Sequence, residues 1–178
     1  MYEKKVKMKT KNRSLFKEIV GIEYFNFEED FVEKDIRCIP MIVRFKMDQA
    51  GIKLKLAEWS KFSTVERIEL ATKPCGDEHE ANLYHQYLAW LIERYTEKEA
   101  TGLVIDQKPA WNELNKVPGL LIEKLEEFDW SISIEQWRLL SGLQRFALLK
   151  LCKPGHESKN FPIAMEEFNL VTEKAIPL

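Results

Sequence analysis

The sequence predicts an all-α fold: a single compact domain of five or six helices with an extended N-terminal segment. Apolar residues recur at steps of three and four along most of the chain, which is the spacing of one helix face. Several of these runs begin with Ser or Asp followed three residues later by Glu or Gln, a pattern typical of helix starts. Residues 19–27 alone are apolar in the manner of a strand, and a single strand cannot make a sheet.

The first expected helix covers residues 40–50. Its apolar residues fall at helical spacing, Pro40 suits a first helical turn, and Gly51 suits the position just past a helix end. Residues 52–56 then alternate apolar and lysine side chains. Because this run is short, we expect only an extended connector.

A capping pattern formed by Ser63 and Glu66 predicts a short helix that ends near Pro74. The longest helix is expected next, over about 78–98, with its start marked by an acidic N-cap. This helix carries a second apolar row besides the one that faces the core, so we expect it to be covered on more than one side. The second row consists of Leu83, Tyr87 and Trp90.

Residues 99–109 interrupt the helical pattern with Gly102 and Pro109, and are the expected surface loop. Pro118 then predicts the start of another helix, which carries a run of leucines at helical spacing. This helix and the loop before it open the second half of the chain.

A further capping pattern, at Ser133 and Gln136, predicts a helix that runs unbroken from Ile134 to Cys152. Lysines near its end and the Pro-Gly pair that follows are typical of a helix C-terminus. A last short helix is expected over residues 162–168, because a proline suits its first turn.

Charge is unevenly distributed along the chain. Residues 1–17 contain seven basic residues and one acidic residue, whereas residues 18–178 contain 20 basic and 28 acidic residues, a net charge of −8. We therefore expect 1–17 to be a basic, flexible tail and 18–178 to be the single helical domain. Such a tail could contact nucleic acid, but the chain lacks the aromatic ladder and Gly-rich spacing of nucleic-acid-binding proteins, so we favour a solvated terminus.

The sequence indicates a cytoplasmic protein. No apolar run approaches the roughly 18 residues that a membrane span needs. Charges interrupt every stretch that could serve as the apolar part of a secretion signal. The three cysteines are odd in number and far apart, unlike a secreted disulfide framework.

Two Cys-x-x-x-His pairs, Cys75 with His79 and Cys152 with His156, are the sharpest local pattern. Together they offer four ligands of the kind that a tetrahedral zinc site uses. The first pair falls at a predicted helix start and the second at a predicted helix end, and nothing in the sequence brings these places together. A metal- or small-ligand-binding helical domain is therefore an alternative, while our preferred interpretation contains no metal.

The sequence carries no pattern that predicts catalysis or a cofactor. A G-x-S-x-G nucleophile elbow is absent, as are glycine-rich phosphate loops. Carboxylates are plentiful, but a catalytic pair cannot be inferred without geometry. We expect no catalytic residue and no cofactor, and an enzyme with an unrecognised site stays open as a further alternative.

The segment 153–161 is the candidate interaction surface, since it is a polar loop held by a strongly predicted helix. It presents three candidate partner-binding residues: His156, Glu157 and Asn160. Arg44 and Arg145 join them as candidates because each interrupts an otherwise apolar helix. The alternative for both arginines is a structural role, in which the long side chain covers apolar surface.

Several sequence strings, taken in order, resemble one known family, the nitrate reductase associated proteins best known from cyanobacteria. The resemblance spans about 25–168, and its most specific strings are R-C-I-P-M and L-Q-R-F-A-L. The matching segments are FNFEEDF (25–31), IRCIPM (36–41), VRFK (43–46), GIKL (51–54), Trp59, QW (136–137), LQRFAL (143–148), PGHE (154–157) and NF (160–161).

This resemblance implies a link to assimilatory nitrate reductase, a molybdenum-cofactor enzyme whose activity or maturation such proteins are thought to support. The family has no established catalytic residues, so the resemblance assigns none here. It implies a non-catalytic accessory protein in nitrate assimilation, whose partner is nitrate reductase or the machinery that loads its molybdenum cofactor. The acidic body is compatible with a basic surface on that partner.

Overall fold

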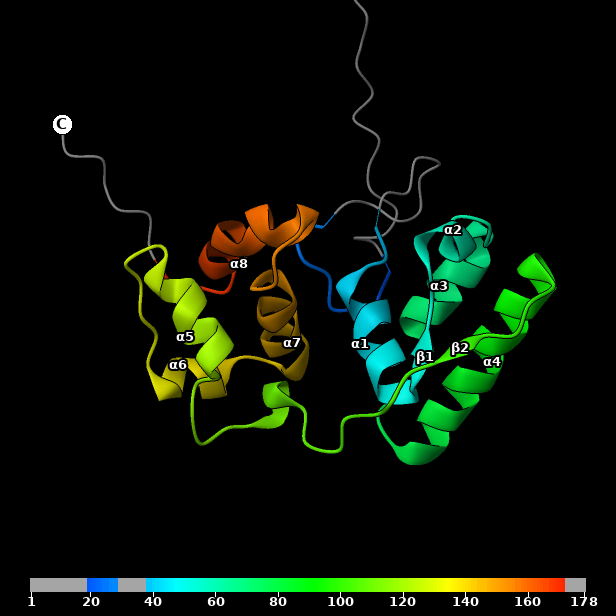
Figure 1. Ribbon diagram of the computed structural model, residues 1–178, viewed down its shortest axis with the longest axis horizontal. Helices are drawn as coiled ribbons and strands as arrows, with labels where there is room; N and C mark the ends of the chain where they lie inside the picture. Colours follow the sequence, from blue (N-terminus) through cyan, green and yellow to red (C-terminus); the bar gives the residue numbers. More distant parts are fainter. Residues whose placement is uncertain (1–18, 29–37, 172–178) are drawn as a thin grey trace, which may run out of the picture.

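The computed structural model describes residues 19–28 and 38–171, so the predicted tail over 1–17 lies outside the described residues. Within them the chain is mostly helical, which confirms the all-α class predicted from the sequence. The elements form two lobes that lie side by side along the longest axis (Figure 1). The amino-terminal lobe contains α1 (Met41–Ala50), β1 (Ile52–Lys53), α2 (Leu56–Trp59), α3 (Thr64–Thr72), α4 (Glu78–Thr96) and β2 (Thr101–Gly102). The carboxy-terminal lobe contains η2 (Ala110–Asn112), α5 (Gly119–Glu126), α6 (Ile134–Leu139), α7 (Gly142–Leu151), η3 (His156–Asn160) and α8 (Phe161–Glu167).

Each lobe buries its own cluster of apolar side chains. In the amino-terminal lobe the cluster forms where α1, α3 and α4 meet, with Tyr84, Leu88 and Leu91 of α4 fully buried. In the carboxy-terminal lobe it forms around α7, with Trp137, Phe146 and Phe161 fully buried. The sequence predicts one core, whereas the structure has two neighbouring clusters. Helix α1 contributes to both, with Met41 in the carboxy-terminal cluster and Val43 and Met47 in the amino-terminal one.

The lobes meet where α1 packs against α7. The ring of Phe45 on α1 lies 5.2 Å from the ring of Phe146 on α7, and Trp111 of η2 packs edge-on against both. Beside these rings, Lys150 Nζ and a carboxylate oxygen of Asp48 form an ion pair at 2.8 Å. Aromatic packing and one charged pair therefore join the two clusters.

Residues 19–28 form an extended strap that crosses both lobes. Ile22 packs against the amino-terminal cluster, whereas Phe25 is buried in the carboxy-terminal one. The backbone N–H of Asn26 donates to the carboxylate of Glu167 at the end of α8, at 2.8 and 3.0 Å. Glu28 accepts the backbone N–H of Met41 at the start of α1. The strap therefore joins the two lobes without belonging to a sheet.

Most helix boundaries follow the capping signals of the sequence. Gly51 has φ of 66°, the left-handed conformation that glycine adopts at little cost, and its N–H bonds the carbonyl of Met47 to end α1. The Ser63 and Glu66 side chains form the predicted capping box at the start of α3. Asp77 accepts the backbone N–H of Glu80 at the start of α4.

The prediction of one helix from Ile134 to Cys152 is wrong. The structure contains α6 and α7 instead, because Leu140 adopts an extended backbone and Ser141 begins a new helix. The Ser141 and Gln144 side chains form a second capping box only eight residues after the first. The short α2 carries no strong sequence signal, and together these changes give eight α-helices among the described residues rather than five or six.

The expected connector at 52–56 and the expected loop at 99–109 meet in a small antiparallel pair of strands. Ile52 lies opposite Gly102 and Lys53 opposite Thr101. The carbonyl of Gly51 accepts the N–H of Leu103, which extends this pairing by one bond. The loop is thereby held against the amino-terminal lobe before it crosses to η2 (Figure 1).

Candidate functional site

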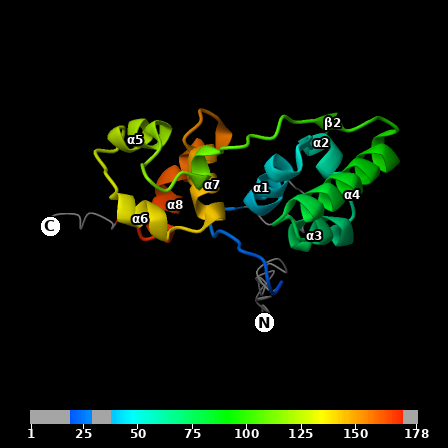
Figure 2. The same ribbon diagram turned by 90° about the horizontal axis from the view of Figure 1, so that it is seen from below.

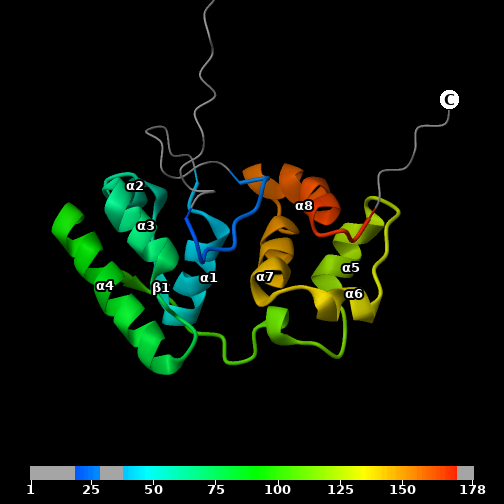
Figure 3. The ribbon, with the colours of Figure 1, turned by 180° about the vertical axis from the view of Figure 1, so that it is seen from behind.

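The outer side of α3 and α4 carries exposed aromatic side chains that other residues hold in place. Helix α4 lies at the outer edge of the amino-terminal lobe, away from α7 (Figures 2 and 3). Trp90 is 51% exposed and Leu83 44% exposed, although large apolar side chains of a helix normally face a core. We call this surface the α3–α4 face, and it consists of Glu66, Glu69, Lys73, Leu83, Tyr87, Trp90, Arg94 and Tyr95.

Rings and cations alternate along the α3–α4 face. The rings of Tyr87 and Trp90 stack with centroids 6.0 Å apart. Lys73 Nζ lies 4.9 Å from the Tyr87 centroid, and the Arg94 guanidinium lies 5.1 Å from that of Trp90. Such cation–π contacts favour this arrangement of the side chains, by about 0.5–1 kcal/mol each at exposed sites.

Carboxylates of α3 bind the polar ends of these side chains. The Tyr87 hydroxyl donates to Glu69 at 2.7 Å, and the Tyr95 hydroxyl donates to Glu66 at 2.8 Å. Arg94 also approaches Glu66, at 3.4 Å. The face is therefore preorganised by bonds between two helices, which reduces the entropy lost when a partner binds it.

The hydrogen bonds on this face shift the pKa values of the groups that make them. Partial burial works to raise the pKa of Glu66, but hydrogen bonds from Ser63 and Tyr95 and the charge of Arg94 outweigh it and hold the pKa below its ordinary value. Burial and the bond to Glu69 raise the pKa of Tyr87. At neutral pH Glu66 is therefore charged, and the phenols of Tyr87 and Tyr95, whose pKa values are raised, stay protonated.

The prediction that the second apolar row of this helix is covered is wrong. The spacing of Leu83, Tyr87 and Trp90 does place them on one face of α4, but Leu83 and Trp90 are exposed. Periodicity identifies a shared helix face without saying whether anything packs on it. The combination of Trp, Tyr and Arg on that face was the available signal, since these types are enriched where partners bind.

A second concave feature lies at the junction of the lobes. A cleft of about 560 Å³ opens between the end of α1, the loop before η2 and Lys150 of α7. The Asp48–Lys150 ion pair lines it, together with Trp111 and the exposed side chain of Val104. Its lining holds two acidic and two basic residues, Asp48, Asp106, Lys53 and Lys150, so the cleft presents no concentrated charge of one sign.

Arg145, a predicted partner-binding residue, has structural bonds. Its Nε donates to the carbonyl of Trp111 at 2.7 Å, its Nη1 donates to the carbonyl of Leu140, and its guanidinium lies 5.9 Å from the ring of Trp137. Arg44, the other candidate arginine, is half-buried on α1 and has contacts of its own. The two arginines lie on helices of different lobes.

The remaining predicted partner-binding residues lie at η3. Asn160 is half-buried, and its side-chain amide donates to the carbonyl of Phe27 in the strap at 3.5 Å. The side chains of His156 and Glu157 lie outside the described residues. The structure therefore does not test whether this segment binds another protein, and that role stays a prediction.

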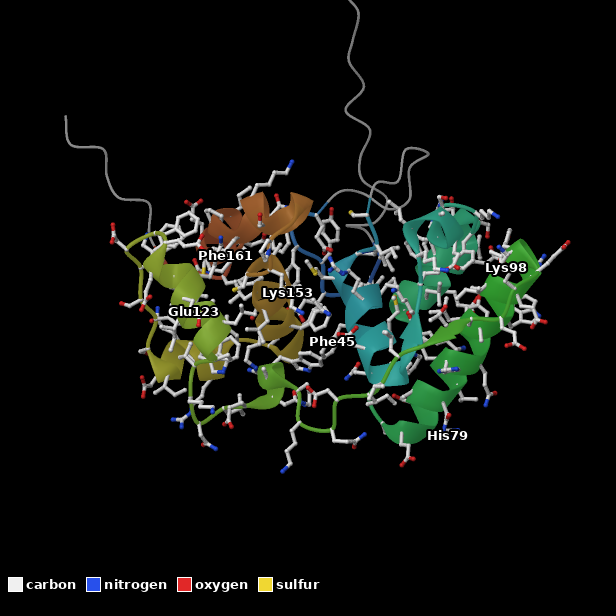
Figure 4. All side chains as sticks on the ribbon, in the orientation of Figure 1. Phe45, His79, Lys98, Glu123, Lys153 and Phe161 are labelled. Atoms are coloured by element: carbon white, nitrogen blue, oxygen red, sulfur yellow. The ribbon has the colours of Figure 1, made fainter. Side chains whose placement is uncertain are left out.

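The structure places the two Cys-x-x-x-His pairs in different lobes. Cys75 belongs to the amino-terminal cluster and Cys152 to the carboxy-terminal cluster. His79 lies on α4 and Lys153, the neighbour of Cys152, follows α7 (Figure 4). Among the described side chains, no three His, Cys, Asp or Glu residues gather as a metal-binding group.

Burial also governs the chemistry of both thiols. It raises the pKa of Cys75 to about 11 and that of Cys152 to about 12. Metal ligation and nucleophilic attack both require the thiolate, which these pKa values disfavour at neutral pH. Near Cys75, burial lowers the pKa of Lys46 to about 8, and its amine donates to the carbonyls of Ala71 and Lys73 at the end of α3.

Comparison with known proteins gives one result. The model of the family described as "Conserved nitrate reductase-associated protein" matches residues 24–168. No curated protein and no solved structure gives a significant match. Across residues 19–28 and 38–171, no helix has both the length and the apolar character that crossing a membrane requires.

Proposed function

The chain belongs to the nitrate reductase-associated protein family, and from this premise we propose that it is a non-catalytic accessory protein that binds its partner through the α3–α4 face. The partner would be assimilatory nitrate reductase or the machinery that loads its molybdenum cofactor. Binding would support the activity or maturation of that enzyme in the cytoplasm, with no chemistry contributed by this chain.

The exposed Trp90 is the observation that carries the proposal. It is 51% exposed, and its ring packs against Tyr87 and Arg94. Large aromatic side chains that are both rigid and exposed supply much of the binding energy at protein interfaces. The segment 153–161 is a second candidate contact, because it is a polar turn next to the strap.

Capture of partners from cells grown on nitrate tests the proposal. The full chain, immobilised, is expected to retain nitrate reductase or a cofactor-loading protein, and the Trp90→Ala variant to bind it at least about tenfold more weakly. Leu139→Ala is the matched control, because Leu139 is 86% exposed on α6 in the other lobe. His156→Ala examines the segment 153–161 in the same assay.

Two results would contradict the proposal. One is capture of proteins unrelated to nitrate assimilation by the unaltered chain. The other is turnover of a substrate by the purified chain alone, which would assign it catalysis of its own.

A further inference from the structure

The α3–α4 face lies in a strongly acidic part of the chain. Residues 63–99 contain eight acidic and four basic residues, and one of the basic residues, Arg67, is only 6% exposed. Lys73 and Arg94 already form ion pairs with Glu69 and Glu66 on this face. These pairs balance within the face, but Glu93, three residues after Trp90 on α4, and Glu97 at the end of that helix add negative charge beside it. This excess of negative charge attracts basic groups and repels acidic ones.

The rings of this face already bind cations of the chain itself. The Arg94 guanidinium lies 5.1 Å from the centroid of Trp90 and 5.6 Å from that of Tyr95, and Lys73 lies over Tyr87. These contacts use part of the ring surface and leave about half of the Trp90 side chain exposed. Aromatic faces with carboxylates beside them are a suitable receptor for further guanidinium or ammonium groups.

We infer that the α3–α4 face binds a segment of the partner protein that is rich in arginine and lysine, with a basic side chain packed on the exposed part of Trp90. The identity of the partner rests on the proposed function, whereas the basic character of the segment rests on charge and ring geometry. A second copy of this chain and the basic residues 1–17 of the chain itself are the competing occupants.

A peptide titration tests the basic character without the reductase. The probe is a synthetic peptide of alternating arginine and alanine, and the control is a glutamate–alanine peptide of the same length. Nitrogen-15-labelled full chain reports binding through the indole N–H signal of Trp90, assigned with the Trp90→Phe variant. We expect the basic peptide alone to shift this signal, with affinity that falls as salt is raised.

Charge variants sharpen the titration. Glu69→Gln with Glu93→Gln removes two negative charges near Trp90 and keeps both side chains polar, so binding of the basic peptide should weaken about fivefold. Glu123→Gln on α5, in the other lobe, is the control and should leave binding unchanged (Figure 4). Equal shifts with both peptides, or peptide binding that leaves the Trp90 indole signal unmoved, would overturn the inference.

The two competing occupants of the α3–α4 face give distinct results in the protein without added peptide. A Trp90 signal that changes with protein concentration would identify a second copy. A signal that moves when Lys5, Lys7 and Lys9 are changed to Gln in the full chain would identify the tail. Either result would overturn the commitment to a partner protein.

Binding of purified nitrate reductase separates this inference from the proposed function. If Trp90→Ala weakens binding of the reductase while the chain with Glu69→Gln and Glu93→Gln binds it as tightly as the unaltered chain, the inference is wrong and the proposed function stands. If the reductase does not bind while the basic peptide does, the proposed partner is wrong and the basic preference of the face stands.

Discussion

The two lobes differ in whether they bury polar groups. The described part of the carboxy-terminal lobe fills its core with apolar side chains alone, led by Trp137, Phe146 and Phe161. The amino-terminal lobe buries the guanidinium of Arg67 and the hydroxyl of Tyr84, and it carries the network of α3 and α4 on its outside. Apolar packing gives a lobe its stability, whereas rigid polar and aromatic groups at a surface give it specificity.

The largest expected effect lies in the apolar lobe. Phe146→Ala removes a fully buried ring that also joins α7 to Phe45 and Trp111, so the free energy of unfolding should fall by about 3–5 kcal/mol. Chemical denaturation followed by circular dichroism measures the loss. Leu139→Ala, on the exposed side of α6, is the control, and a comparable loss there would show that the core does not dominate stability.

A smaller loss of stability is expected when Arg145, which bonds backbone carbonyls of the same lobe, is replaced. Arg145→Met keeps much of the side-chain volume but leaves the carbonyls of Trp111 and Leu140 without their guanidinium donor, at a cost of about 2 kcal/mol. Denaturation of this variant beside Arg138→Met checks the value, because Arg138 is exposed and its Nε donates to one carbonyl, that of Leu114. If Arg145→Met were stabilising, the arginine would be free for the partner-binding role predicted from the sequence.

In the amino-terminal lobe, Glu66→Gln should reduce stability by about 1 kcal/mol at neutral pH, because a charged acceptor of several hydrogen bonds becomes neutral. The folded pKa of Glu66 is lowered from the ordinary 4.5, so its contribution is present above pH 4.5 and is lost as pH falls through the folded pKa. The stability curves of the two proteins against pH should therefore converge in acid. Parallel curves would contradict this account.

The last expected effect is of the same size but has the opposite sign. The Tyr84 hydroxyl is fully buried and has no hydrogen-bond partner among the described residues, so Tyr84→Phe removes an unsatisfied polar group and should stabilise the protein by about 1 kcal/mol. Thermal unfolding of the variant measures the gain. A loss of stability would mean that the hydroxyl has an acceptor, and the contrast between the lobes would weaken.

Local signals predict much of this fold, and long-range packing accounts for what they miss. Caps at Ser63, Asp77 and Ser133 mark helix starts because a side chain satisfies backbone groups within three residues. The break at Ser141 carried the same signal, but the apolar pattern continued across it and suggested one helix. The division of the core into two clusters depends on how helices meet, which periodicity does not encode.

The candidate site was harder to predict than the helices. Sequence reasoning selected Arg145 as an isolated charge on an apolar helix, and its bond to the distant carbonyl of Trp111 becomes visible only once η2 is placed. It assigned Trp90 to a covered face, because a large apolar side chain usually seeks a core. The stack of Tyr87, Trp90 and Arg94 depends on the carboxylates of another helix, Glu66 and Glu69, so spacing within α4 could not reveal it.

The bonds between the strap and α8 also determine the order in which parts of the molecule can fold during synthesis. Asn26 leaves the ribosome early, but its acceptor, Glu167, is among the last described residues to be made. A nascent chain can therefore form the amino-terminal lobe while translation continues, yet it cannot close the strap until α8 has emerged. Closure of the strap is therefore a late step of folding, which follows the folding of the amino-terminal lobe.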